Sequence, residues 1–117
     1  MTLEAFYNEI GSNYGAALAR MGNSEKMLGK FVRKFLSDKT AEELIAAFAQ
    51  EDYSTAFRMA HTLKGLCSNL GLDKLQKSSA ELTEALRGGV ADNAAELLTQ
   101  VRADYDMTIS ALEQLDE

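Results

Sequence analysis

The chain has 117 residues and a net charge of −6 at pH 7, with one His, one Cys, no Pro and no Trp. This length predicts a single domain, residues 1–117, that buries about two-thirds of its unfolded surface and folds without disulfides or metal. One cysteine cannot form an internal disulfide, one histidine cannot build a His-rich metal site, and an acidic chain is poorly suited to bind nucleic acid.

The sequence also predicts no membrane contact. It contains no apolar run of about 18 residues, the length that crosses a bilayer, and no targeting segment at its N-terminus. We therefore expect a cytoplasmic protein. Because the sequence starts at Met1 and ends soon after the last predicted helix, we also expect it to be free-standing.

Apolar residues recur at helical spacing from the start of the chain. The first repeats predict short N-terminal helices within about 2–21. Gly22-Asn23 then interrupts the pattern. Ser24 is a good N-cap, so we expect the next helix over about 24–37.

The middle of the chain predicts one short and one long helix. Thr40 and Glu43 have the spacing of a capping box, which favours a short helix over about 41–50. Asp52 is then placed to cap a long helix over about 52–70.

Glycines mark the ends of the remaining helices. Gly71 stands where a left-handed residue commonly ends a helix, and a further helix is expected over about 73–87. Gly88-Gly89 predicts a turn, after which apolar spacing indicates a long last helix over about 91–116.

These patterns predict an all-α fold. No segment alternates with the period of two that a half-buried strand shows, and the absence of proline suits a nearly all-helical chain. Helices joined by short turns favour an antiparallel, up-down four-helix bundle with short additional N-terminal helices. We expect the four bundle helices to be those over 24–37, 52–70, 73–87 and 91–116.

The only histidine lies on the outer face of the long middle helix. With His61 at 0° and about 100° per residue, the apolar residues form one arc facing the core. That arc contains Ala56, Met59, Ala60, Leu63, Leu66, Cys67 and Leu70. The stripe around His61 instead contains Ser54, Phe57, Arg58, Lys64, Gly65 and Ser68. We therefore expect an exposed imidazole beside cations and small residues, and a buried, inert thiol at Cys67.

Two neighbours of His61 suggest a role for it. A glycine inside a helix costs about 1 kcal/mol relative to alanine, and Gly65 lies on the outer face, where it would allow another molecule to approach closely. Lys64 follows His61 by one turn, within reach of an anion carried on the imidazole ring. An exposed lysine alone would prove nothing, but residues 53–80 carry four cations against one anion. The rest of the chain carries 8 cations and 17 anions.

His61-Thr62-Leu63-Lys64-Gly65, followed by Gly71 and Leu75, resembles the motif of histidine-containing phosphotransfer (Hpt) domains, the phosphocarriers of multistep two-component relays. Gly22-Asn23-Ser24, the helix with Phe31 and Phe35, and Leu82 to Arg87 extend the resemblance over essentially the whole chain. It implies that His61 accepts a phosphoryl group from a receiver phospho-aspartate and passes it to another receiver.

The resemblance also implies partners and residue roles. Receiver domains or a hybrid sensor histidine kinase would be the partners, with Mg²⁺ on the receiver and no cofactor on this chain. The chain would be a monomeric carrier without kinase or phosphatase activity of its own. Lys64 would stabilise the phosphoryl group, while the docking surface would comprise Gly65, Ser68, Arg58, Phe57 and Ser54. Phe57 has an equally good alternative as a packing residue against a neighbouring helix.

One position departs from the family pattern. Some members use a glutamine on the next helix to orient the imidazole, whereas an ungapped reading places Thr83 there. Either Thr83 makes a weaker contact or Gln76 substitutes for it.

Two other functions are compatible with a helical bundle. An Hpt-like bundle that is never phosphorylated would serve as a binding module for a receiver or kinase. A cofactor-binding four-helix bundle is the third hypothesis, for which the sequence offers one exposed histidine and no second set of ligands.

Overall fold

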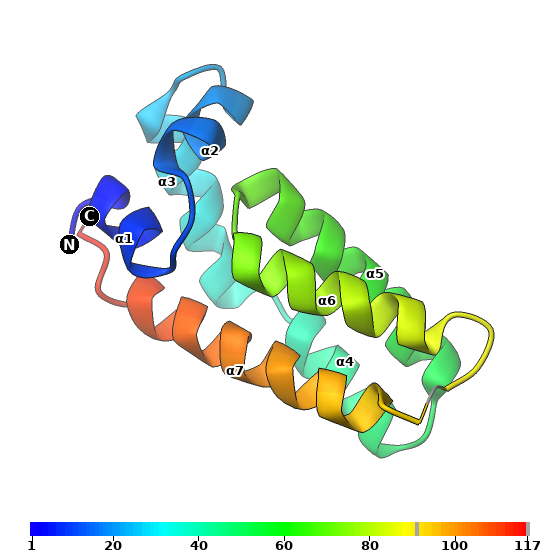
Figure 1. Cartoon of the computed structure of the whole chain (residues 1–117). Helices are drawn as coiled ribbons and strands as arrows, with labels where there is room; N and C mark the ends of the chain where they lie inside the picture. The colour runs from blue at the N-terminus through cyan, green and yellow to red at the C-terminus, as the bar shows by residue number, and fades with distance from the viewer. Residues whose placement is uncertain (91, 117) are drawn as a thin grey trace.

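The computed structural model describes residues 1–90 and 92–116, and every regular element in these residues is a helix (Figure 1). The all-α prediction is therefore confirmed. The elements are α1 (Leu3–Glu9), α2 (Tyr14–Arg20), α3 (Glu25–Lys34), the short 3-10 helix η1 (Phe35–Ser37), α4 (Thr40–Ala49), α5 (Tyr53–Leu70), α6 (Asp73–Leu86) and α7 (Ala94–Leu112).

Three of the predicted helix ends are confirmed by their hydrogen bonds and backbone angles. The Ser24 side chain accepts a hydrogen bond from the Met27 N–H, and Asp52 Oδ1 accepts one from the Thr55 N–H, both at 3.2 Å. These bonds satisfy amide groups that have no partner within the first turn of a helix. Gly71 ends α5 in the left-handed conformation, with φ of 70°.

The start of α4 differs from the predicted capping box. Thr40 is already the first helical residue, and its N–H donates to Asp38 Oδ1 at 2.9 Å. Asp38 has extended backbone angles, so its short side chain reaches the amide two residues ahead. The helix therefore begins one residue before the predicted 41–50 segment.

The four helices of the bundle are α4, α5, α6 and α7, which corrects the predicted membership. α5 packs most extensively against α6 and α4, α6 packs against α7, and α4 contacts α7. α3 touches α5 only lightly and gathers with α1 and α2 at one end of the elongated molecule (Figure 1). A tight turn through Glu51, with φ of 57°, folds α4 back along α5. The short helix can therefore bury Ala41, Leu44 and Ala47 in the core.

The last helix is shorter than predicted. The expected start at residue 91 lies outside the described residues, as does residue 117 at the end of the predicted domain, and α7 begins at Ala94 after a turn. After Leu112 the chain leaves the helix, and the Asp116 N–H donates to the Met1 carbonyl at 2.8 Å. The C-terminal residues thus pair with the N-terminus instead of extending the helix.

The N-terminal helices hold the C-terminal end of α5 in place. Tyr7 is fully buried, and its hydroxyl donates to the carbonyl of Leu70, the last residue of α5, at 2.6 Å. Burial raises the pKa of the Tyr7 hydroxyl. Next to it, Gly71 lies so close to Ala17 that a Cβ on Gly71 would stand 2.8 Å from the Ala17 Cβ. α1 and α2 are therefore part of the core that positions α5.

Among the described helices, none has both the length and the apolar content needed to span a bilayer.

Candidate functional site

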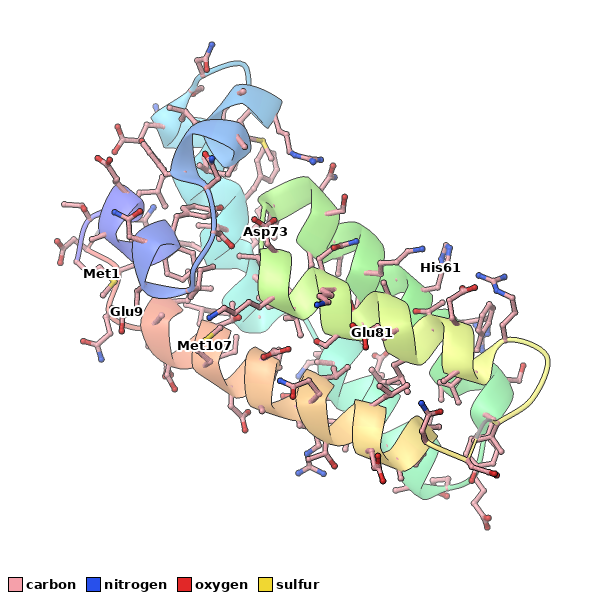
Figure 2. All side chains as sticks on the ribbon, in the orientation of Figure 1. Met1, Glu9, His61, Asp73, Glu81 and Met107 are labelled. Carbon is pink, nitrogen blue, oxygen red and sulfur yellow. The ribbon has the colours of Figure 1, made fainter. Side chains whose placement is uncertain are left out.

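The face of α5 that points away from the bundle carries His61. Ala56, Ala60, Leu63 and Cys67 are all fully buried on the opposite face, in positions that recur every three or four residues. This fixes the rotation of the helix and leaves His61 exposed. In Figure 2 the His61 side chain extends outward from the bundle into open space. Its ring is therefore accessible to another molecule.

The side chains next to His61 leave room for an approaching surface. A Cβ built on Gly65 would meet nothing within 4 Å, so this glycine fills no packing need inside the molecule. Lys64 and Ser68 are half-buried on the same side of the helix. An incoming group can thus reach the imidazole past two small residues, with an ammonium group one turn away.

Phe57 combines the two roles that the sequence left open. It is half-buried and packs against the core, as a structural residue would. Its ring centroid also lies 6.3 Å from that of His61, with an angle of 32° between the ring planes. One face of Phe57 therefore forms part of the surface beside the imidazole.

Arg87 and Glu84 belong to this surface but were missed as functional residues in the sequence. Arg87 Cζ lies 5.1 Å from the Phe57 ring centroid. Its Nη2 donates to Glu84 Oε2 at 2.8 Å. The sequence shows the three-residue spacing of this pair, but only the antiparallel packing of α6 on α5 brings the end of α6 beside His61. The short turn at Gly71 between α5 and α6 is the one sequence signal from which the position of Arg87 and Glu84 beside His61 could have been inferred.

The charges of these groups act on one another. Hydrogen bonding to Arg87 and its charge hold the pKa of the Glu84 carboxyl below its ordinary value, and the charges of Lys64 and His61 lower it further. Glu84 in turn raises the pKa of Arg87. The site therefore contains a carboxylate among three cationic or potentially cationic side chains.

The two remaining predicted docking residues lie at the α5 start. Arg58 is exposed, and its Nη2 donates to Thr55 Oγ1 at 3.2 Å. It borders the same shallow hollow as His61 and Arg87. Ser54 is exposed but borders a neighbouring hollow, one shared with Phe57 and the turn after α6. The structure thus brings Arg58 to the histidine and places Ser54 at the margin.

Comparison with protein families identifies the family of this chain. The family model described as Hpt domain matches residues 27–115, well over half of the sequence. The chain belongs to the Hpt domain family. Hpt domains carry out histidine phosphotransfer in phosphorelays and interact there with receiver domains and kinases. No curated protein and no solved structure matches the chain at the similarity we required.

The structure does not support either candidate for orienting the imidazole of this Hpt domain. Thr83 is fully buried, and its Oγ1 donates to the Ser79 carbonyl at 2.7 Å. Gln76 lies near the start of α6, about 12 Å along the helix from Glu84 at the rise of 1.5 Å per residue. Across residues 1–90 and 92–116, His61 makes no side-chain hydrogen bond. A short hydroxyl at position 83 bonds within its own helix instead of reaching across to α5.

The remaining reactive groups of the Hpt domain lie apart from this surface. Cys67 is fully buried, as predicted, and burial is the main cause that raises the pKa of its thiol to about 12. Within the part of the chain that the structure describes, no three His, Cys, Asp or Glu side chains gather into a possible metal site.

Proposed function

We propose that this chain is a phosphorelay carrier in which His61 takes a phosphoryl group from the phospho-aspartate of one receiver domain and gives it to another. The observation that supports this most directly is the placement of the only histidine of an Hpt-family chain. It is exposed on α5, beside a glycine that leaves the approach open.

The chemistry requires one unprotonated ring nitrogen of His61. Its lone pair attacks phosphorus while the phosphorus–oxygen bond of the acyl phosphate breaks, and the electron pair returns to the aspartate carboxylate. The N–H proton on the other ring nitrogen is released to solvent when the phosphohistidine becomes neutral at the ring. Transfer to a second aspartate runs the same steps in reverse. Catalysis of such a reaction depends mostly on positioning and on neutralising the phosphoryl charge.

Residues of α5 supply part of the positioning and part of the charge neutralisation. The Lys64 ammonium lies one turn from His61 and would pair with the phosphoryl oxygens. Gly65 and Ser68 would let the backbone of a receiver approach the ring. Phe57 and Arg58 would form the rim of the docking surface, with Ser54 at its outer edge.

The receiver would supply the remaining groups. We propose that it holds the Mg²⁺ ion and that this chain needs no cofactor and has no kinase or phosphatase activity of its own. We also propose that the chain is a monomer and that it acts in the cytoplasm, where it would meet receivers and the kinase. The overall charge of −6 is unsuited to nucleic acid, while the cations around His61 complement an acidic receiver pocket.

The test is phosphoryl exchange with the receiver domains of the same organism. Incubation with a phosphorylated receiver should give the wild-type chain an acid-labile, base-stable phosphate, and His61→Gln should abolish it. Gly65→Gln should block transfer because its side chain fills the open approach, while the fold, followed by circular dichroism, stays unchanged.

The outcomes separate the alternatives. Undiminished labelling of His61→Gln would overturn the proposal. Receiver binding that survives this substitution, with no transferable phosphate on the wild-type chain, would identify a binding module instead. Normal transfer by Gly65→Gln would contradict the role given to the open approach.

A further inference from the structure

An ion pair at the end of α6 lies beside His61, and the chemistry proposed above does not use it. Arg87 Nε and Nη2 donate to Glu84 Oε2 at 3.1 and 2.8 Å. Both side chains are more than half exposed, at 56% and 66%. An exposed pair of this kind contributes little to folding, so it can break at small cost when a better partner is near.

The Arg87 guanidinium has a path from Glu84 to the histidine. It lies over the Phe57 ring, and the centroid of that ring is 6.3 Å from the centroid of the His61 imidazole. Arg87 and His61 also border the same shallow hollow. A flat aromatic face supports a guanidinium without fixing it, so a change of side-chain rotamer can move the charge toward the imidazole.

A phosphoryl group is a stronger partner for this guanidinium than a carboxylate. It carries more negative charge and offers three acceptor oxygens, and the planar fork of arginine matches it as well as it matches a carboxylate. Glu84 also lies near the charges of His61 and Lys64, where it would repel a phosphoryl group. The two anions therefore compete for one set of cations.

We propose that Arg87 exchanges partners when His61 is phosphorylated: its guanidinium leaves Glu84 and binds the phosphoryl oxygens. Glu84 is then a positioning residue that sets how readily this exchange occurs. The inference rests on the proposed function, because it concerns the phosphorylated form of the same site. By linkage, the free energy by which the Glu84–Arg87 ion pair stabilises the unphosphorylated form is lost on phosphorylation.

The first experiment needs no receiver. Phosphoramidate phosphorylates histidine chemically: its phosphorus–nitrogen bond breaks, ammonia leaves, and a new phosphorus–nitrogen bond forms to the ring. The Nε–Hε resonance of Arg87, assigned by its loss in Arg87→Ala, is then followed by NMR. We expect it to shift on phosphorylation, together with the Glu84 carboxyl carbon resonance, which should move toward the value of an unpaired carboxylate.

The second experiment measures the transfer equilibrium with a receiver domain. Glu84→Gln should raise the ratio of phosphorylated chain to phosphorylated receiver about two- to fivefold, the factor an exposed ion pair supplies, and Arg87→Ala should lower it similarly. In the double variant the effect of Glu84→Gln should be smaller, because part of it acts through Arg87. The matched control is Glu42→Gln, which removes the exposed Lys39–Glu42 pair of α4 at the same three-residue spacing and should change neither measurement.

Three results would overturn the inference: an Arg87 resonance that does not respond to phosphorylation, an equal effect of Glu84→Gln with and without Arg87, or a control that behaves like Glu84→Gln. A chain labelled by phosphoramidate but by no receiver would overturn the proposed function while the Arg87 resonance still decides the partner exchange. A chain labelled by neither donor would overturn both.

Discussion

The two faces of α5 place two nucleophilic side chains in opposite surroundings. Cys67 lies on the face that packs into the bundle and is fully buried, and its thiol pKa is raised to about 12. His61 lies less than two turns away on the other face and is exposed. The rotation of one helix therefore decides which of the two can react with another protein.

The same contrast holds for two glycines of this segment. Gly65, on the outer face, has open space where a side chain would be, whereas Gly71 adopts φ of 70° and touches Ala17. One glycine is required by the fold and the other is not. Substitutions on the two faces should therefore affect stability very differently.

The largest effect is expected on the core face. Leu63→Ala should lower the free energy of unfolding by about 2 to 5 kcal/mol, because the side chain is fully buried and its loss leaves a cavity. His61→Ala, two residues away, should change it by no more than about 0.5 kcal/mol. Urea denaturation of both variants checks this. Similar losses for the two would mean that His61 packs against the molecule.

Gly71→Ala comes next. An alanine in the left-handed conformation costs roughly 1 to 2 kcal/mol, and its Cβ would stand 2.8 Å from the Ala17 Cβ. We expect a total loss of about 2 to 3 kcal/mol in unfolding free energy. A companion Ala17→Gly substitution should recover part of this loss by removing the clash, and no recovery would show that the backbone angle alone is responsible.

Alkaline pH should lower the stability of the fold through ionisable groups buried in its core. The folded thiol of Cys67 has its pKa raised to about 12 from an ordinary value of 9.0, so unfolding lets it ionise. Stability is unaffected below pH 9 and falls as the pH rises toward 12, by up to about 1.4 kcal/mol per pH unit. Tyr7, whose pKa is also raised, adds to this loss at the upper end of the range. Thermal melts of wild type and Tyr7→Phe between pH 8 and 11 check this, because the difference between the two profiles gives the Tyr7 contribution; a flat wild-type profile would contradict the prediction.

Gly65→Ala should stabilise the chain. Alanine is favoured over glycine inside a helix by about 1 kcal/mol, and the added Cβ meets nothing within 4 Å. We expect the midpoint of urea unfolding to rise with an unchanged slope. A loss of stability would indicate that the outer face is more crowded than the structure shows.

The smallest change in stability is expected for Lys64→Ala. The side chain is half-buried on the outer face and forms no ion pair among the described residues, so unfolding free energy should stay within about 0.5 kcal/mol. Phosphoryl transfer should nevertheless slow, because the ammonium is no longer available to the phosphoryl oxygens. Lys64→Arg is the control: it keeps the charge and should retain more of the rate.

The outward direction of His61 could be predicted from the sequence because it depends only on helix periodicity. The caps at Ser24 and Asp52 and the left-handed Gly71 followed from local chemistry in the same way. The sequence did not predict which helices form the bundle, because α4 is short and its place between α5 and α7 depends on the turn at Glu51.

The same reason explains the part of the site that was missed. Arg87 is 26 positions from His61 in the sequence and borders the same shallow hollow only because α6 packs back along α5. Thr83 was suggested by an ungapped reading of a family pattern, and its hydroxyl instead donates to the Ser79 carbonyl within α6. Contacts between helices depend on side-chain length and on packing, which no single helical pattern contains.

The hydrogen bond from Tyr7 to Leu70 bears on where this domain can be cut. The family match begins at residue 27, inside α3, and so leaves out α1 and α2. A fragment trimmed to that limit would lose the fully buried Phe6 and Tyr7 rings and leave the end of α5 exposed. For this Hpt domain, the stretch that the family model matches is smaller than the packed unit, and fragments meant for expression or fusion should keep the first 26 residues.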